Sequence, residues 1–362
     1  MPVVAFGCGK IFSFFFNDSA AAVLSRKIVA VADNLASKVG TTVNVSGRTV
    51  PVISMDELRN RFPDCILIIT TADTYSIFRQ LDDDSAFSST QCCVYSYVLS
   101  KTIDAYRSRT YPETFRRTQV PLIPKKIHYC WFGKKPLPER YVAWMNSWEK
   151  LCPDYEIIRW DETNYDMAWC PYMEEAYTSM KWGFVSDVAR IDVVYRHGGI
   201  YLDTDVELIQ NLDELLYQQC FFGIDESLRV STGLGFGAVA GSPVLKGLLD
   251  LYAQKHFAST DGKIDITPCP AVQETYFRNL GYMNDGELYE ASDFTVYPAE
   301  VLAGMSSLTG MLHLSEHTYS IHHYDGSWGD PSRQQKKHLV REQLKDLFLH
   351  RDNSNFSYRQ NL

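Results

Sequence analysis

One segment constrains the fold of this chain more than any other: a helix, two glycines that end it, and a strand that leads into two aspartates. Val185–His197 has the apolar pattern of a helix, and the two consecutive glycines after it are typical of a helix end. Ile200–Leu202 then has the composition of a buried strand, and it leads into Asp203 and Asp205. This order predicts an α/β fold with both acids at the carboxyl end of a strand, where such sheets bind ligands.

The two aspartates are candidate metal ligands. Residues two apart on an extended strand project to one face, so we expect the carboxylates of Asp203 and Asp205 to converge. Two convergent carboxylates suit Mn²⁺ or Mg²⁺. Asp187 and Arg190 share a face of the preceding helix and can present an acceptor and a bidentate donor. The alternative is a turn in which an Asp caps the next element, beside a surface pair of Asp187 and Arg190.

An aromatic residue ends a second strand. Residues 123–133 form a basic, proline-punctuated lead into an apolar strand, with Trp131 near its end. An aromatic plane at this position can stack on a nucleobase, which contributes about 1–3 kcal/mol per base. The alternative interpretation is an aromatic side chain packed in the core.

A third segment, Tyr319–Trp328, places two histidines and a Ser-Trp pair around a glycine turn. An imidazole, from His323, is a candidate third metal ligand. The hydroxyl of Ser327 and the indole N–H of Trp328 can donate to phosphate oxygens. By itself this segment is equally consistent with a buried histidine pair.

Together these segments resemble one family, the sugar-nucleotide-dependent glycosyltransferases that carry a D-x-D motif. The family includes bacterial capsular-polysaccharide transferases, fungal initiating α-mannosyltransferases and, more distantly, the large clostridial glucosylating toxins. The matching segments are IPKKIHYCWFG (123–133), SDVARIDVVYRHGGIYLDTD (186–205) and IHHYDGSW (321–328). The resemblance implies that residues 123–330 form a GT-A glycosyltransferase domain, an α/β sandwich around one mixed sheet.

The resemblance also implies roles for individual residues. Asp187, Arg190 and Asp205 are the expected catalytic residues, and Asp203, Asp205 and His323 the expected metal ligands. The expected substrate contacts include the nucleobase, the donor sugar, the ribose and the diphosphate, and they come from Trp131, Ser186, Asp187, Arg190, Tyr201, Asp203, Ser327 and Trp328.

These observations predict a metal-dependent glycosyltransferase. We expect it to move a sugar from a nucleoside-diphosphate sugar, UDP-linked, to a saccharide or lipid-linked acceptor in surface polysaccharide synthesis, with retention of configuration. Glu207, Asp225 and Glu226 are possible acid/base or acceptor-binding groups. The alternatives are a nucleotide-sugar sensor without turnover and a phosphohydrolase that uses the same carboxylates and needs further ligands for two metals.

Residues 1–100 alternate apolar strands, among them Val3–Phe6 and Ile28–Ala32, with helical patterns such as Phe12–Leu24, and predict a small Rossmann-like α/β domain. Gly7 and Gly9 form a turn after the first strand, and Asp33 ends the second, where a ribose-binding acid would lie. Phe12 occupies the place of the third glycine of the dinucleotide motif. The turn is therefore either a structural βαβ connection or a site for a nucleotide or nucleotide-sugar.

Charge and composition limit the classes of partner that the protein is expected to bind. The net charge of −9 argues against nucleic acid, because the phosphates require an excess of Lys and Arg. Residues 101–122 are a basic, proline-containing linker, and 331–362 hold a basic amphipathic helix and a tail. These basic segments are either solvated or in contact with an anionic membrane or lipid-diphosphate acceptor.

The cellular setting follows from cysteine usage and hydropathy. The nine cysteines show no C-x-x-C spacing, which favours free thiols over disulfides or zinc. The first residues lack a secretory pattern, and no apolar run approaches about 18 residues, the length a spanning helix needs. We therefore expect a cytoplasmic protein, with peripheral contact at the inner membrane face.

Overall fold

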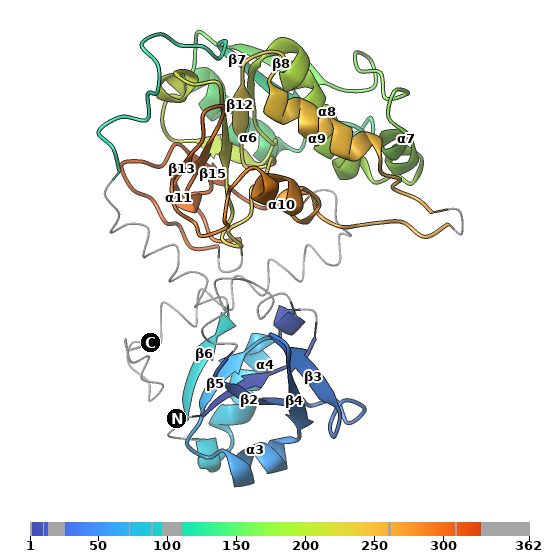
Figure 1. Ribbon diagram of the computed structural model, residues 1–362, viewed down its shortest axis with the longest axis vertical. Helices are drawn as coiled ribbons and strands as arrows, with labels where there is room; N and C mark the ends of the chain where they lie inside the picture. The colour runs from blue at the N-terminus through green and yellow to red at the C-terminus, as the bar shows by residue number, and fades with distance from the viewer. Residues whose placement is uncertain are drawn as a thin grey trace. The chain divides into compact units, whose positions relative to one another are not determined.

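The computed structural model describes residues 2–9, 11–13, 26–71, 73–87, 90–95, 111–259, 262–307 and 310–326. They form two compact units. The described residues of the first unit lie within Met1–Thr102, apart from residues 310–311, and those of the second lie within Ile103–Ser307 and Leu312–Gln334. Both units combine strands and helices (Figure 1), so the predicted α/β class is confirmed.

The first unit is built on a six-stranded sheet in the order β3-β4-β2-β1-β5-β6. All its strand pairs are parallel except the β3–β4 hairpin. Strands β1, β2 and β5 are almost continuously buried, as a sheet covered on both faces requires. The elements are β1 (Val3–Phe6), β2 (Ile28–Ala32), β3 (Thr42–Val45), β4 (Arg48–Ile53), α3 (Met55–Arg61), β5 (Ile66–Ile69), α4 (Thr74–Asp82), a 3-10 turn (Ser85–Phe87) and β6 (Gln91–Val94).

Apolar runs predicted the strands of this sheet better than its hairpin. The strands expected at Val3–Phe6 and Ile28–Ala32 have those bounds in the structure. The β3–β4 hairpin was missed because β3 is short and half polar, and its turn needs positive φ at Ser46 and Gly47. The helix expected at Phe12–Leu24 falls largely outside the described residues.

The second unit contains a seven-stranded mixed sheet in the order β13-β14-β11-β12-β9-β7-β8 and a two-stranded ribbon of β10 and β15. Its strands are β7 (Lys126–Cys130), β8 (Glu156–Trp160), β9 (Gly199–Tyr201), β10 (Val206–Leu208), β11 (Cys220–Gly223), β12 (Phe236–Ala238), β13 (Tyr289–Glu290), β14 (Thr295–Tyr297) and β15 (Ser320–His322). Its helices are α6 (Glu139–Leu151), α7 (Pro171–Thr178), α8 (Trp182–His197), α9 (Pro243–Ala253), α10 (Cys269–Asn279) and α11 (Ala299–Leu302), with a 3-10 turn at Asp213–Leu216.

The helices of the second unit cover the mixed sheet from two sides. One apolar cluster joins α7, α8 and α9, which lie together in Figure 1, to side chains of β9, β11 and β12. Another joins α6 to the opposite side, where Trp148 packs with Ile127 and Ile200. The sheet is therefore the middle layer between these helices.

Helix α8 is buried around nearly its whole circumference. Every residue from Asp187 to Val194 is buried, which is typical of a helix inside a core. Its charged side chains must therefore find partners inside the protein. The helix ends at His197, as predicted, because Gly198 takes a φ of +62° and a Cβ there would lie 2.9 Å from Pro124 Cγ.

The described part of the basic linker, residues 111–122, contains no helix or strand. Basic side chains in and beside it have partners: Lys125 contacts Asp154 and Asp213, and Arg117 contacts Glu290. The amphipathic helix and tail expected in 331–362 fall outside the described residues. Among the helices that the structure describes, none has the length and apolarity to cross a bilayer.

A buried hydrogen bond ties α6 to the ribbon: the indole N–H of Trp148 donates to the Val206 carbonyl at 2.9 Å. Trp148→Phe leaves that carbonyl unpaired, so we expect the free energy of unfolding to fall by about 1–3 kcal/mol. Urea denaturation followed by circular dichroism measures the change. The control is Trp169→Phe at a site with 36% exposure. Equal losses in both variants would contradict the prediction.

Candidate functional site

The described candidate residues gather where two neighbouring strands end. Strands β7 and β9 are parallel neighbours in the seven-stranded sheet. Trp131 directly follows β7, and Asp203 comes two residues after β9. Because parallel strands end at the same edge of a sheet, residues some seventy positions apart in sequence meet there.

The two aspartates lie in a turn, and the expectation that they project from one extended strand is wrong. Strand β9 ends at Tyr201, and the backbone N–H of Val206 donates to the carbonyl of Asp203 at 3.1 Å. This bond closes a four-residue turn before β10 begins. The carboxylates of Asp203 and Asp205 therefore converge because the chain turns between them.

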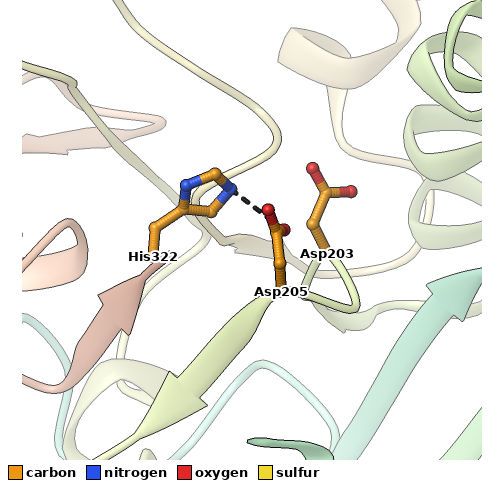
Figure 2. Close-up of side chains that lie close together, drawn as sticks. All are labelled: Asp203, Asp205 and His322. Atoms are coloured by element: carbon orange, nitrogen blue, oxygen red, sulfur yellow. Dashed lines mark ion pairs between the residues drawn. The ribbon is translucent and has the colours of Figure 1, made fainter. Parts of the chain in front are cut away.

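A histidine completes a three-residue group at this turn. One ligand atom from each of Asp203, Asp205 and His322 lies within 4.8 Å of the others. Figure 2 shows the imidazole facing the Asp205 carboxylate, with His322 Nε2 at 3.3 Å from Asp205 Oδ1. Antiparallel pairing of β10 and β15 sets His322 opposite Val206, the residue after Asp205. Two carboxylates and one imidazole fit Mn²⁺ or Mg²⁺ and leave positions open for phosphate oxygens.

The predicted third ligand, His323, points elsewhere. Its ring stacks on Trp144 with centroids 4.0 Å apart, and its Nε2 lies 2.9 Å from Glu207 Oε2. Successive side chains at a strand end face opposite ways, so only one of the two histidines can face Asp205. The geometry assigns that position to His322 instead of His323.

A buried guanidinium lies between the helix and the turn. The Arg190 side chain is 5% exposed and contacts Asp187 Oδ1 at 2.9 Å and Asp203 Oδ1 at 3.4 Å. The hydroxyl of Tyr201 donates to Asp203 Oδ1 at 2.8 Å. The alternative of a surface pair is therefore wrong, and Tyr201 acts on Asp203 directly.

Burial dominates the ionisation of these acids. It raises the pKa of Asp187 to about 6, although Arg190 acts in the opposite direction. It also raises the pKa values of Asp203 and Asp205. At Asp187 and Asp203 desolvation outweighs the positive charge of Arg190, and a cation bound beside these carboxylates would stabilise their charged forms.

Of the four other residues predicted to contact the substrate, the structure describes two. Trp131 is half-buried, meets Tyr141 edge-on at 5.7 Å and donates its indole N–H to the Lys135 carbonyl at 2.6 Å. The Ser186 hydroxyl donates to the Trp182 carbonyl at 3.3 Å, within its own helix. Ser327 and Trp328 lie outside the described residues.

The three acids predicted as possible acid/base or acceptor-binding groups contact different partners. Glu207 pairs with His323, and Asp225 accepts a backbone N–H from Ser227 two residues on. Glu226 is buried and accepts from the Ser307 hydroxyl. None of them belongs to the three-residue group formed by the described residues at the turn.

Asp325 is the functional candidate that the sequence reasoning missed. It is buried, and its backbone N–H donates to Asp205 Oδ2 at 2.9 Å. Its carboxylate accepts from the hydroxyl of Tyr141 and from Arg140. The Asp-Gly pair that contains it also suits an ordinary turn, so no sequence signal separated the two uses.

The glycine turn of the first unit is occupied by the protein itself. Asp33 accepts the backbone N–H groups of Cys8 and Leu35 and the ammonium of Lys38. Burial opposes ionisation of Asp33, but these donors prevail and lower its pKa to about 2. The carboxylate that would bind a ribose is therefore already saturated, which favours the structural interpretation of the turn.

Comparison with known proteins places this geometry in a family. Residues 138–222, which include α8, β9 and both aspartates, match the glycosyltransferase sugar-binding region containing a DXD motif. This region is therefore similar to the DXD region of glycosyltransferases. The match to the DXD region ends before β15, so His322 and Asp325 lie outside it.

Several curated proteins are similar to this chain. Inositol phosphoceramide mannosyltransferase 3 of Schizosaccharomyces pombe is 32% identical over 155 residues, 42% of each chain. Mannosyl phosphorylinositol ceramide synthase SUR1 of Saccharomyces cerevisiae is 30% identical over 38% of this chain and 36% of its own length. Subversion of eukaryotic traffic protein A of Legionella pneumophila is 26% identical over 31% and 21%. The chain thus spans less than half the length of these relatives.

A solved structure, the PaToxG glycosyltransferase, superposes with a TM-score of 0.36 at 18% identity, over 51% of this chain and 79% of its own. A superposition this loose does not establish a common fold.

The choice between the two histidines can be tested by metal binding. We expect His322→Ala to weaken Mn²⁺ binding by about 10-fold or more, because it removes a ligand, while His323→Ala leaves the affinity within about 2–3-fold. Electron paramagnetic resonance of free Mn²⁺ measures both. The reverse order of effects would restore His323 as the ligand.

Proposed function

We propose that this chain is a metal-dependent glycosyltransferase that moves a sugar from a nucleoside-diphosphate sugar to a saccharide or lipid-linked acceptor. The observation that carries the proposal is the group Asp203, Asp205 and His322, whose ligand atoms lie within 4.8 Å beside the family-matched helix and strand. A divalent cation bound there supplies positive charge for the diphosphate leaving group.

The protein's own groups fit the remaining demands of the reaction. Arg190 offers a preorganised positive charge beside Asp203 that needs no reorganisation when the leaving group becomes negative. Asp187, whose carboxylate is buried beside Arg190, can also hold a sugar hydroxyl, and a donor that lacks the hydroxyl would lose this buried hydrogen bond, which gives specificity. Trp131, half-buried at the end of β7, offers a ring face for a nucleobase.

The finer features of the reaction rest on the family resemblance and on the names of relatives. We propose a GT-A arrangement for the second unit, a Rossmann-like one for the first, a UDP-linked donor and retention of configuration. Relatives named as mannosyltransferases of inositol phosphoceramide support a lipid-linked acceptor and make mannose a candidate sugar. Surface polysaccharide synthesis by a cytoplasmic enzyme at the inner membrane face is the corresponding biological proposal.

Two alternatives receive less support. A two-metal phosphohydrolase requires further ligands, and the described residues contain one group of three or more metal-ligating side chains, the one at the turn. A nucleotide sensor in the first unit requires a free acid at the end of β2, but Asp33 is held by Cys8, Leu35 and Lys38.

Removing one ligand charge tests the metal-dependent reaction. We expect Asp205→Asn to lower Mn²⁺-dependent donor hydrolysis or transfer by on the order of 100-fold with the fold intact, because the diphosphate loses its charge partner. Turnover across a panel of nucleotide sugars, with Mn²⁺ or EDTA, measures this. Asp154→Asn, at an exposed acid paired with Lys125, is the control. Equal wild-type activity in EDTA would exclude the metal role.

The nucleobase contact has a test of its own. Trp131→Ala should weaken nucleoside-diphosphate binding by about 1–3 kcal/mol through lost stacking, measured by calorimetry with Mn²⁺ present. Trp169→Ala, a partly exposed tryptophan that precedes α7, is the matched control. Unchanged affinity in the Trp131 variant would assign this ring to packing.

A further inference from the structure

The segment that follows β15 is attached to helix α6 at two points. The first is the stack of His323 on Trp144. The second is Asp325, which is 4% exposed and accepts hydrogen bonds from the Tyr141 hydroxyl and from Arg140. Both partners of Asp325 come from the first turn of α6, so the helix start and the segment act as one piece.

Asp325 also reaches the candidate metal turn, but through its main chain. Its backbone N–H donates to Asp205 Oδ2 at 2.9 Å, and the neighbouring backbone N–H of His323 donates to the Asp205 carbonyl at 2.9 Å. The residue therefore contacts α6 with its side chain and Asp205 with its amide. A hydrogen bond of this kind fixes which Asp205 oxygen remains free for other partners.

A second carboxylate this close to Asp205 is unfavourable by itself, because like charges repel in a poorly solvated site. Arg140 pairs with the Asp325 carboxylate and the Tyr141 hydroxyl donates to it, and both stabilise its charge. A neutral residue would avoid the repulsion and serve equally well if this segment only needed to form a turn. The presence of the Asp325 charge despite this repulsion points to a need for rigid attachment of the segment.

We infer that Asp325 is a positioning residue of the metal site. By attaching the segment after β15 to α6, it aims its own N–H at Asp205 and sets that carboxylate for cation binding. The ligand role of Asp205 rests on the proposed function, whereas the attachment is a property of this chain. Since linkage is reciprocal, cation binding also stabilises the attached segment.

The chain offers a matched control in Asp192. It is another buried aspartate, and it accepts from the Tyr165 hydroxyl at 2.7 Å and from Arg196 Nε at 2.9 Å. The chemistry is that of Asp325, a carboxylate between a tyrosine and an arginine. Its backbone lies inside helix α8, so its N–H belongs to the hydrogen bonds of that helix and does not donate to Asp205.

The test compares Asp325→Asn, Tyr141→Phe and Asp192→Asn in the full chain. We expect Asp325→Asn to weaken Mn²⁺ binding by about 10–100-fold, Tyr141→Phe by less, and Asp192→Asn not at all. Metal-free hydrogen exchange of the peptide covering residues 320–326 should accelerate in the first two variants only. The midpoint temperature of thermal unfolding should drop by similar amounts in Asp325→Asn and Asp192→Asn.

Each outcome decides the inference. Mn²⁺ affinity and exchange in Asp325→Asn that match those of Asp192→Asn would overturn it, as would a wild-type chain that binds no Mn²⁺. If Asp325→Asn fails to fold, the same two measurements on Tyr141→Phe decide in its place. A wild type that binds Mn²⁺ but turns over no donor removes the proposed function and leaves this inference standing.

Discussion

The second unit depends on one buried positive charge. Arg190 lies on a helix buried around most of its surface, and its guanidinium contacts Asp187 on the same helix and Asp203 beyond the next strand. Removing one partner of a buried ion pair typically costs about 3–5 kcal/mol, because the other charge is left unpaired in a medium that solvates it poorly. The position of the DXD turn against α8 follows from this requirement.

Around that charge, the site is assembled from three separate parts of the sequence. Helix α8 and strand β9 bring Arg190 and Asp203, and β15 brings His322 by pairing with β10. Helix α6 supports the far side through Trp148, which bonds the carbonyl of Val206. Hydrophobic burial drives these elements together, while the hydrogen bonds and ion pairs decide their register. The result is a group of partly buried acids close to compensating charge.

Local pattern was enough to predict much of this arrangement. The helix end at His197, the strand after it and the shared helix face of Asp187 and Arg190 depend on interactions a few residues apart, and the structure contains all three. The prediction failed where the outcome depends on distant partners. The different directions of His322 and His323 relative to Asp205 follow from the pairing of β10 with β15, more than a hundred residues apart.

The amino-acid sequence by itself determined the α/β class, the acids at the end of β9 and the likeness to DXD glycosyltransferases. These depend on apolar periodicity, helix-stopping glycines and residue types, which are local properties. Only the tertiary structure decided that His322 faces Asp205, that Asp33 is saturated by Cys8 and Lys38, and that Asp325 joins α6 to the site. Each of these is a choice between neighbouring or chemically equivalent groups. Packing of elements that are remote in sequence makes that choice.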